Sequence, residues 1–172
     1  DTCAIAQLDG LEALLPRFKD KIVVVDHHAT TDDIGSLRWV DTSAAAAGVM
    51  VTELIDELGW PLAPLAAEAL MTAITTDTGW PRFANPDARC PCAVAGFVDA
   101  GVGPDTLFGR IYQTDRPERL ALLQCVLASL ELHCGGRLAA MTIRKTDFEA
   151  TGARPDETEN LVNEALRLAS VE

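Results

Sequence analysis

The pattern of apolar and polar positions predicts a buried strand near the amino end of the chain. Ile22 is followed by three β-branched valines, residues 23–25, and then directly by Asp26, His27 and His28. A continuous β-branched run is typical of a strand covered on both faces. Open α/β sheets place ligand sites at the carboxyl ends of such strands, so these polar residues hold a candidate catalytic position. On this segment alone, an equal alternative is that Asp26 caps a helix and the histidines occupy a turn.

Helical spacing of apolar residues dominates most of the remaining chain. The predicted helices cover residues 5–15, 44–58, 88–100, 105–112, 117–129 and 156–169, and one more begins at Pro64 and leads to Asp77. A second short strand is expected over residues 36–40, and a hairpin over residues 130–143. This order of elements predicts an α/β fold with three layers, in which helices flank a Rossmann-like, mainly parallel sheet.

The helix over residues 117–129 carries a leucine stripe. The stripe consists of Leu120, Leu123, Leu127 and Leu130. Because these positions share one helical face, we expect the stripe to lie in the core.

Two further acids stand at element ends. Asp77 lies among threonines at the end of the helix that begins at Pro64, and Gly79 marks the turn after it. Asp1 precedes a stretch with helical spacing. Aspartates with a histidine, and without a thiolate, form a ligand set suited to a divalent ion such as Mn²⁺. We therefore expect Asp1, His27 and Asp77 to converge at the carboxyl edge of the sheet.

Three segments together resemble the DHH phosphoesterase superfamily. They are Val23 to His28, then Trp39 to Ser43 before an alanine-rich helix, and then Thr76 to Phe83. Their order and spacing are most similar to the NrnA-like branch of oligoribonucleases and 3′-phosphoadenosine-5′-phosphate phosphatases. The resemblance covers nearly the whole chain, and the combination is far more specific than Asp-His-His alone.

The resemblance implies a role for each residue of the candidate site. In the superfamily, four motifs hold a pair of Mn²⁺ ions. By resemblance, Asp1 would bridge both ions, and His27 and Asp77 would be further metal ligands. Asp26 would be the acid that orients an imidazole, and His28 would lie near the scissile phosphate and act on the leaving side.

Two further residues are candidates for substrate binding. Arg82 closely follows the Asp77 segment and could hold a phosphate as a bidentate donor, but a surface ion pair explains it equally well. Ser43 precedes the helix predicted over residues 44–58. Its hydroxyl either caps this helix, which is the favoured alternative, or meets a phosphate at the helix amino terminus.

The resemblance also implies that the chain is an internal piece of a longer protein. The first metal motif of the family is expected before Asp1, and a second, substrate-binding domain after Glu172. We therefore expect residues 1–150 to form the DHH domain and residues 151–172 to form a linker helix towards the second domain. Without those two parts, the 172-residue piece is expected to hydrolyse little or nothing by itself.

Composition limits the class of partner. A net charge of −12 argues against a surface that holds duplex nucleic acid, which proteins bind largely through lysine and arginine. A short oligoribonucleotide or small nucleotide remains suitable because bound metal ions supply positive charge locally. The apolar runs are shorter than the roughly 18 residues that span a bilayer, so we expect no membrane partner and a cytoplasmic location. A homodimer is a further expectation for this protein.

The cysteines do not predict a structural metal site. The chain has five cysteines, an odd number, and they lack a paired zinc spacing. We expect reduced and mostly buried thiols.

The expected activity is Mn²⁺-dependent phosphoester hydrolysis of short oligoribonucleotides, linear dinucleotides and 3′-phosphoadenosine-5′-phosphate, with two ions in the complete site. Two alternatives stay open. One is an inorganic pyrophosphatase or polyphosphatase of the same superfamily. The other is a degenerate DHH domain that binds a nucleotide or a partner without catalysis.

Overall fold

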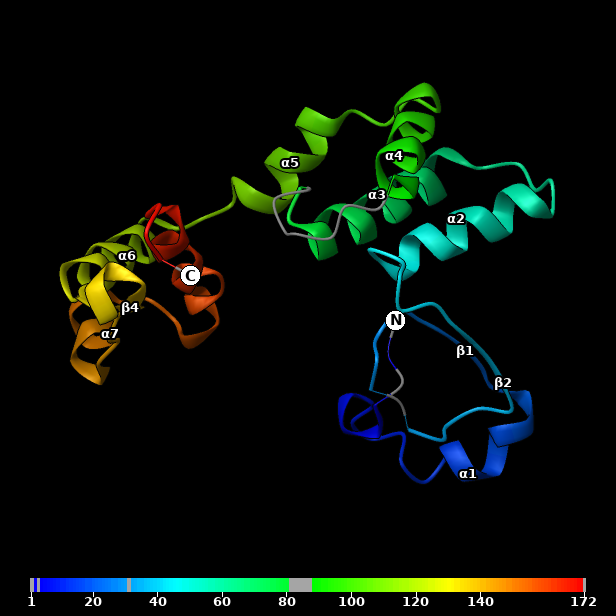
Figure 1. The fold of residues 1–172 in the computed structure, drawn as a ribbon, viewed down its shortest axis with the longest axis horizontal. Helices are drawn as coiled ribbons and strands as arrows, with labels where there is room; N and C mark the ends of the chain where they lie inside the picture. The colour runs from blue at the N-terminus through cyan, green and yellow to red at the C-terminus, as the bar shows by residue number, and fades with distance from the viewer. Residues whose placement is uncertain (1, 3, 31, 81–87, 172) are drawn as a thin grey trace. The chain divides into compact units, whose positions relative to one another are not determined.

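The computed structural model describes residues 2, 4–30, 32–80 and 88–171 (Figure 1). The chain forms two compact units, Asp1–Phe108 and Gly109–Glu172. This division does not test the predicted extent of the DHH domain, residues 1–150, or the predicted role of residues 151–172 as a linker towards a second domain. Both stay predictions.

The first unit contains a parallel pair of strands, which confirms the α/β class and the parallel pairing (Figure 1). Strand β1 covers Val23–Asp26 and strand β2 covers Leu37–Val40. In their register, Val23 pairs with Leu37 and Asp26 with Val40. Because side chains alternate along a strand, Val24 and Asp26 point to the same face, and both are buried.

The other face of this pair differs from the expectation of a strand covered on both sides. Val23 is 57% exposed, and Leu37 beside it is 62% exposed. A small apolar cluster forms on the buried face, where Val24 and Ile34 pack with Leu8, Leu15 and Ile22. The exposed side chains lie at the start of the pair, whereas Val25, next to the polar end of β1, is half-buried.

Four helices complete the first unit and the junction to the second. They are α2 (Ala47–Glu57), α3 (Pro64–Thr78), α4 (Arg89–Asp99) and α5 (Pro104–Tyr112). Helices α2, α3 and α4 pack against one another, and their fully buried side chains include Met50, Met71, Ile74 and Phe97. An added Cβ at Gly48 would lie only 3.0 Å from Cγ1 of Ile74, so this glycine permits the close approach of α2 to α3.

Glycines end α2 and α3 as the sequence predicts. Gly59 and Gly79 have φ angles of 61° and 59°, in the left-handed region that stops a helix. The start of α2 differs from its prediction. Ala46 has extended backbone angles, so the helix begins at Ala47 rather than at Ala44, and no side chain caps it.

The helix predicted over residues 5–15 is wrong. The structure has a short 3₁₀ helix, η1 (Ile5–Gln7), then α1 (Leu15–Phe18) and a second 3₁₀ helix, η2 (Lys19–Lys21). Gly10 has a φ of 79°, which no α-helix accommodates, and this turn interrupts the apolar spacing.

The second unit joins a helix, a hairpin and short helical turns. Its elements are α6 (Pro117–Ala128), β3 (Glu131–His133), η3 (Cys134–Gly136), β4 (Leu138–Ala140), α7 (Lys145–Thr151), η4 (Pro155–Thr158) and η5 (Leu161–Arg167). Strands β3 and β4 pair antiparallel, which confirms the predicted hairpin. No predicted element covers α7, although Asp147 provides a start signal by accepting a hydrogen bond from the Arg144 backbone N–H at 2.7 Å.

Two predictions in this unit need correction. Leu122 and Val126 form the buried core face of α6, and Leu123 of the predicted stripe packs against their cluster, whereas Leu120 and Leu127 are 56% and 43% exposed. The helix predicted over residues 156–169 is replaced by η4 and η5, because Asn160 between them adopts a φ of 62°. Its apolar positions were informative all the same, since Leu161 and Ala165 are buried.

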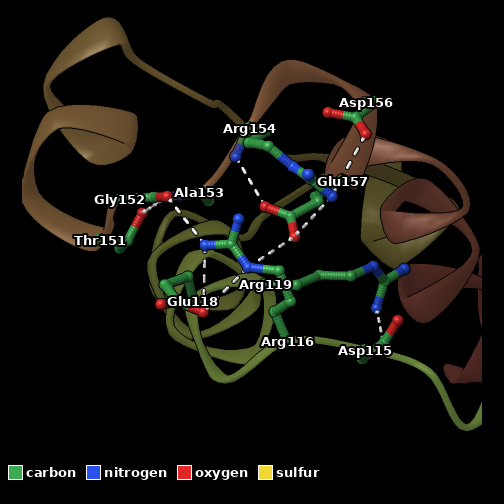
Figure 2. Close-up of polar contacts among 10 residues, drawn as sticks. All are labelled: Asp115, Arg116, Glu118, Arg119, Thr151, Gly152, Ala153, Arg154, Asp156 and Glu157. Carbon is green, nitrogen blue, oxygen red and sulfur yellow. Dashed lines mark hydrogen bonds and ion pairs between the residues drawn. The ribbon is translucent and has the colours of Figure 1, made fainter.

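A buried carboxylate fastens η4 to the start of α6 (Figure 2). Glu157 is 7% exposed and accepts the Arg154 backbone N–H at 2.7 Å. Its Oε1 lies 3.6 Å from Nε of Arg116, whose Nη2 lies 3.1 Å from Glu118 and donates to the Gly152 carbonyl at 3.4 Å. The Glu118 backbone N–H and the Arg116 guanidinium lower the pKa of the Glu118 carboxyl. Breaking a pair of this kind is costly because a buried charge would be left uncompensated.

Two further expectations concern membranes and thiols. Within the described part of the chain, no helix has both the length and the apolar character needed to cross a bilayer. Four cysteines there are free thiols, as expected, but only Cys90 is buried, and Cys92 and Cys134 are exposed.

Gly35 offers a stability test of the β1 packing. An added Cβ would lie 2.9 Å from the Ile22 carbonyl oxygen and from Cγ2 of Val24, so Gly35→Ala should lower the free energy of unfolding by about 1–3 kcal/mol. The matched control is Gly96→Ala in α4, where nothing lies within 4 Å and helix propensity should raise that free energy by about 0.5–1 kcal/mol. Urea unfolding followed by tryptophan emission measures both, because all three tryptophans, at 39, 60 and 80, belong to this unit. Equal effects of the two substitutions would contradict the packing described.

Candidate active site

Asp26 is the buried centre of the polar segment after β1. Its side chain is fully buried, and its Oδ1 accepts hydrogen bonds from the backbone N–H groups of His27 and His28 at 2.6 and 2.9 Å. The same oxygen lies 2.6 Å from Nδ1 of His28. These donors satisfy a carboxylate that would otherwise be costly to bury, and they fix the turn that presents both imidazoles.

His27 has a defined tautomer because of what its ring contacts. Its Nδ1 lies 3.1 Å from the carbonyl oxygen of Ala44, at the start of the buried segment before α2. A carbonyl oxygen only accepts hydrogen bonds, so Nδ1 carries the proton. Nε2 lies on the other side of the ring, 3.4 Å from Oδ2 of Asp77.

His28 is held by Asp26 and is more accessible. Its side chain is 53% exposed, and Asp26, as an acceptor, requires the proton on Nδ1. The rings of His27 and His28 are 4.5 Å apart between centroids. An exposed imidazole whose orientation is fixed by a buried acid is suited to a polar contact with a bound ligand.

Asp77 reaches the site from the last turn of α3. Thr75, Thr76 and Thr78 surround it in the sequence, but their hydroxyls donate back to helix carbonyls four residues earlier, at 2.6 to 2.8 Å. The threonine hydroxyls therefore donate to backbone carbonyls of the helix rather than to the Asp77 carboxylate. The carboxylate itself is 33% exposed and faces His27.

The facing atoms of His27 and Asp77 fit a divalent cation. With Nδ1 protonated, Nε2 of a neutral imidazole is a lone-pair acceptor, and a carboxylate oxygen is another acceptor. Two acceptors 3.4 Å apart repel one another unless a proton or a cation lies between them. Metal bonds of about 2.0–2.2 Å to nitrogen and oxygen place neighbouring ligand atoms roughly 3–3.5 Å apart, which matches this distance. A metal-bound histidine also usually donates its second N–H to a carbonyl, as His27 does to Ala44.

A second grouping of possible ligands is less suitable. One atom each of Asp26, His27 and His28 lie within 4.8 Å of one another, which is compact enough for an ion. However, Oδ1 of Asp26 already accepts from two backbone N–H groups and from the His28 ring. Asp26 is therefore better suited to orienting His28 than to binding a metal.

Asp41 organises the loop that carries Ala44. Its Oδ1 accepts the Ser43 backbone N–H at 2.9 Å and the Ser43 hydroxyl at 2.6 Å, and its Oδ2 accepts from Nη1 of Arg89 at 2.8 Å. The Ser43 hydroxyl, then the Arg89 guanidinium, then the Ser43 backbone N–H lower the pKa of Asp41 from 3.8 to about 2. The favoured prediction that Ser43 caps the following helix is wrong, because α2 starts four residues later without a side-chain cap.

The structure brings together four of the predicted site residues, namely Asp26, His27, His28 and Asp77. Ser43 directly precedes Ala44. Its hydroxyl donates to Asp41 and also accepts a hydrogen bond from Nη2 of Arg89 at 3.3 Å. Asp1 and Arg82 lie outside the described residues, so their predicted roles as metal ligand and phosphate donor stay predictions.

Sequence reasoning missed two contributors to this geometry. The carbonyl of Ala44 carries no side-chain signal at all, and Arg89 lies 48 residues after its partner Asp41. A signal for the turn was available in Asp41-Thr42-Ser43, since Asp often accepts from a backbone N–H two residues on.

Comparison with known proteins agrees with the motif pattern. No family model matches the chain. The chain is 30% identical over 145 residues to the bifunctional oligoribonuclease and PAP phosphatase NrnA of Bacillus subtilis, covering 83% of this chain and 46% of the relative. It is 37% identical over 117 residues to the protein of the same name from Thermus thermophilus, covering 68% and 36%. The chain thus spans less than half the length of these two relatives.

A solved structure shows the same fold. An exopolyphosphatase-related protein from Bacteroides fragilis aligns with a TM-score of 0.92 at 19% identity, over 99% of this chain and 51% of that chain. The fold, the Asp-His-His segment and the similar sequences define a DHH-family protein. Within that family, the chain belongs to the NrnA-like proteins.

The lowered pKa of Asp41 gives a test of the turn. A carboxyl whose pKa is lowered by folding stabilises the fold above its unfolded value near 3.8, and this contribution is lost as the pH falls through about 2. Ser43→Ala removes the largest cause, so the pKa of Asp41 should rise towards 3.8, as measured by carboxyl ¹³C shifts during an acid titration. Thr42→Ala, in the same turn, is the control and should leave the value near 2. An unchanged Asp41 pKa in Ser43→Ala would mean that the hydroxyl contact does not hold in solution.

Proposed function

We propose that the protein containing this chain is a Mn²⁺-dependent phosphoester hydrolase that acts on short oligoribonucleotides and 3′-phosphoadenosine-5′-phosphate. The observation that carries the proposal is the pair of facing acceptors, Nε2 of His27 and Oδ2 of Asp77, 3.4 Å apart beside a fixed Asp-His-His turn. The names of the two relatives, oligoribonuclease and PAP phosphatase, support the substrate class.

His27 and Asp77 would hold the metal in this proposal, and Asp1 would complete the site by resemblance. When bound, divalent ions of this kind make water a nucleophile near neutral pH and neutralise charge on phosphoryl oxygens. The mixture of imidazole and carboxylate favours Mn²⁺ over ions that prefer thiolates.

His28 would act on the substrate rather than on the metal. Its Nδ1 proton is held by Asp26, so Nε2 is the ring nitrogen that would contact a phosphate oxygen or the leaving group. A protonated His28 would donate from Nε2 to the leaving oxygen, and the buried Asp26 carboxylate would stabilise the imidazolium that exists before this transfer. Arg82 would add a bidentate phosphate contact.

The acidity of the chain supports a small substrate. With a net charge of −12, long polyanions are repelled from most of the surface, whereas a dinucleotide needs positive charge only at the metal site. This favours short oligoribonucleotides over long polyphosphate, and it makes polyphosphate a useful comparison substrate.

Substitution of the two metal ligands tests the proposal. With Mn²⁺ in excess, His27→Ala and Asp77→Asn should each lower kcat/KM for a linear diribonucleotide by about a thousandfold or more, because metal binding contributes several kcal/mol to catalysis. Calorimetric titration with Mn²⁺ should show the matching loss of binding. The assay uses the full-length protein, with 3′-phosphoadenosine-5′-phosphate, pyrophosphate and polyphosphate as parallel substrates.

Asp99→Asn is the matched control, since Asp99 is likewise an aspartate in the last turn of a helix in the same unit. It should retain wild-type Mn²⁺ binding and activity. Full activity of His27→Ala or Asp77→Asn would refute the metal assignment. Hydrolysis of pyrophosphate or polyphosphate alone would refute the substrate class, and nucleotide binding without hydrolysis of any substrate would identify a non-catalytic domain.

A further inference from the structure

A chain of hydrogen bonds connects α4 to the ring of His27. Nη1 of Arg89 donates to Oδ2 of Asp41 at 2.8 Å, and Nη2 donates to the Ser43 hydroxyl at 3.3 Å. Within this turn, the Ala44 backbone N–H donates to the carbonyl oxygen of Asp41 at 3.1 Å. The carbonyl oxygen of Ala44 then accepts from Nδ1 of His27 at 3.1 Å.

The same turn is tied to the segment that carries His27. The backbone N–H of Asp41 donates to the carbonyl oxygen of Asp26 at 3.1 Å, which extends the parallel pairing of β1 and β2 by one residue. The position of the Ala44 carbonyl relative to His27 is therefore set at two points. One is this strand pairing and the other is the side chain of Arg89.

The charges around Arg89 indicate that it holds the Asp41 turn and does not bind phosphate. Its Nη1 lies 2.8 Å from Asp41 and 3.6 Å from Oε1 of Glu53, so its positive charge faces two carboxylates. A guanidinium that is already paired in this way has little net attraction for an anion. Its planar geometry instead suits the simultaneous contact with the Asp41 carboxylate and the Ser43 hydroxyl.

We propose that Arg89 is a positioning residue that fixes the Nδ1-protonated tautomer and the orientation of His27 through the Asp41 turn. Nε2 is thereby kept as the unprotonated ring nitrogen that faces Asp77. The metal-binding consequence rests on the proposed function, but the effect on the His27 tautomer does not. Arg89 lies outside the motif segments that carry the family resemblance.

The direct test is the tautomer of His27 in the metal-free, full-length protein. Long-range ¹H–¹⁵N correlation spectra distinguish a ring protonated at Nδ1 from one protonated at Nε2. The wild-type protein should show Nδ1–H, and Arg89→Ala should show a substantial fraction of Nε2–H. Glu53→Gln is the matched control, because it removes the other carboxylate beside Arg89 without touching the Asp41 turn, and it should retain the wild-type spectrum.

Two functional readouts follow from the same variants. Arg89→Ala should weaken Mn²⁺ binding by about tenfold, the lower end of the range for residues that support metal ligands, and should lower kcat for the dinucleotide while leaving KM nearly unchanged. Arg89→Lys keeps the charge near Asp41 but not the two-point contact, so it should restore part of the binding. A rise in KM alone would mean that Arg89 binds substrate directly and would overturn the proposal.

A double substitution tests the route through Asp41. Asp41→Asn should reproduce the tautomer change, and Arg89→Ala combined with Asp41→Asn should be no worse than the more severe single variant. If Arg89→Ala does not fold, Asp41→Asn and Arg89→Lys provide the same decision. An unchanged His27 spectrum in the folded variants overturns the proposal. If the wild-type protein binds no Mn²⁺ while the tautomer still changes, the proposed function fails and the role of Arg89 stands.

Discussion

The hydrogen bond from Nδ1 of His27 to the carbonyl oxygen of Ala44 decides which atoms of the site are available for chemistry. A carbonyl cannot donate, so this single contact, at 3.1 Å, places the proton on Nδ1 and leaves Nε2 towards Asp77. With the opposite tautomer, Nε2–H would point at the Asp77 carboxylate and form an ordinary hydrogen bond. The location of one proton on His27 thus decides whether His27 and Asp77 face each other as two possible metal ligands or form a hydrogen bond with each other.

The fold supplies this contact by bringing three separate chain segments together. Parallel pairing of β1 with β2 sets the Asp26 turn beside the residues that follow β2. Helix α3, packed closely on α2 at Gly48, carries Asp77 to the same place in its last turn. Burial of Asp26, satisfied by the N–H groups around it, keeps the two imidazoles in defined orientations. Local secondary structure, helix packing and buried polar contacts therefore all act on the same few atoms.

The sequence predicted the parts of this arrangement that depend on side-chain type and spacing. The valine run predicted β1, and Gly59 and Gly79 predicted the ends of α2 and α3. His27 and Asp77 were expected to converge, and they lie 3.4 Å apart between Nε2 and Oδ2. What it missed depends on backbone geometry and on distant packing. The carbonyl of Ala44 is invisible in a residue pattern, and the exposed Leu120 and buried Leu122 reflect which face of α6 meets its neighbours. The interrupted helices near Gly10 and Asn160 follow from left-handed backbone angles, which override apolar spacing.

In the proposed site, His27 and Asp77 bind one metal ion through Nε2 and Oδ2. The most direct measurement is a crystal structure of the full-length protein with Mn²⁺, in which anomalous scattering locates the ion. We expect an anomalous peak at about 2.0–2.2 Å from both atoms, with Nδ1 of His27 still donating to the Ala44 carbonyl. A peak that contacts neither atom, or a direct His27–Asp77 hydrogen bond that persists at saturating Mn²⁺, would contradict it.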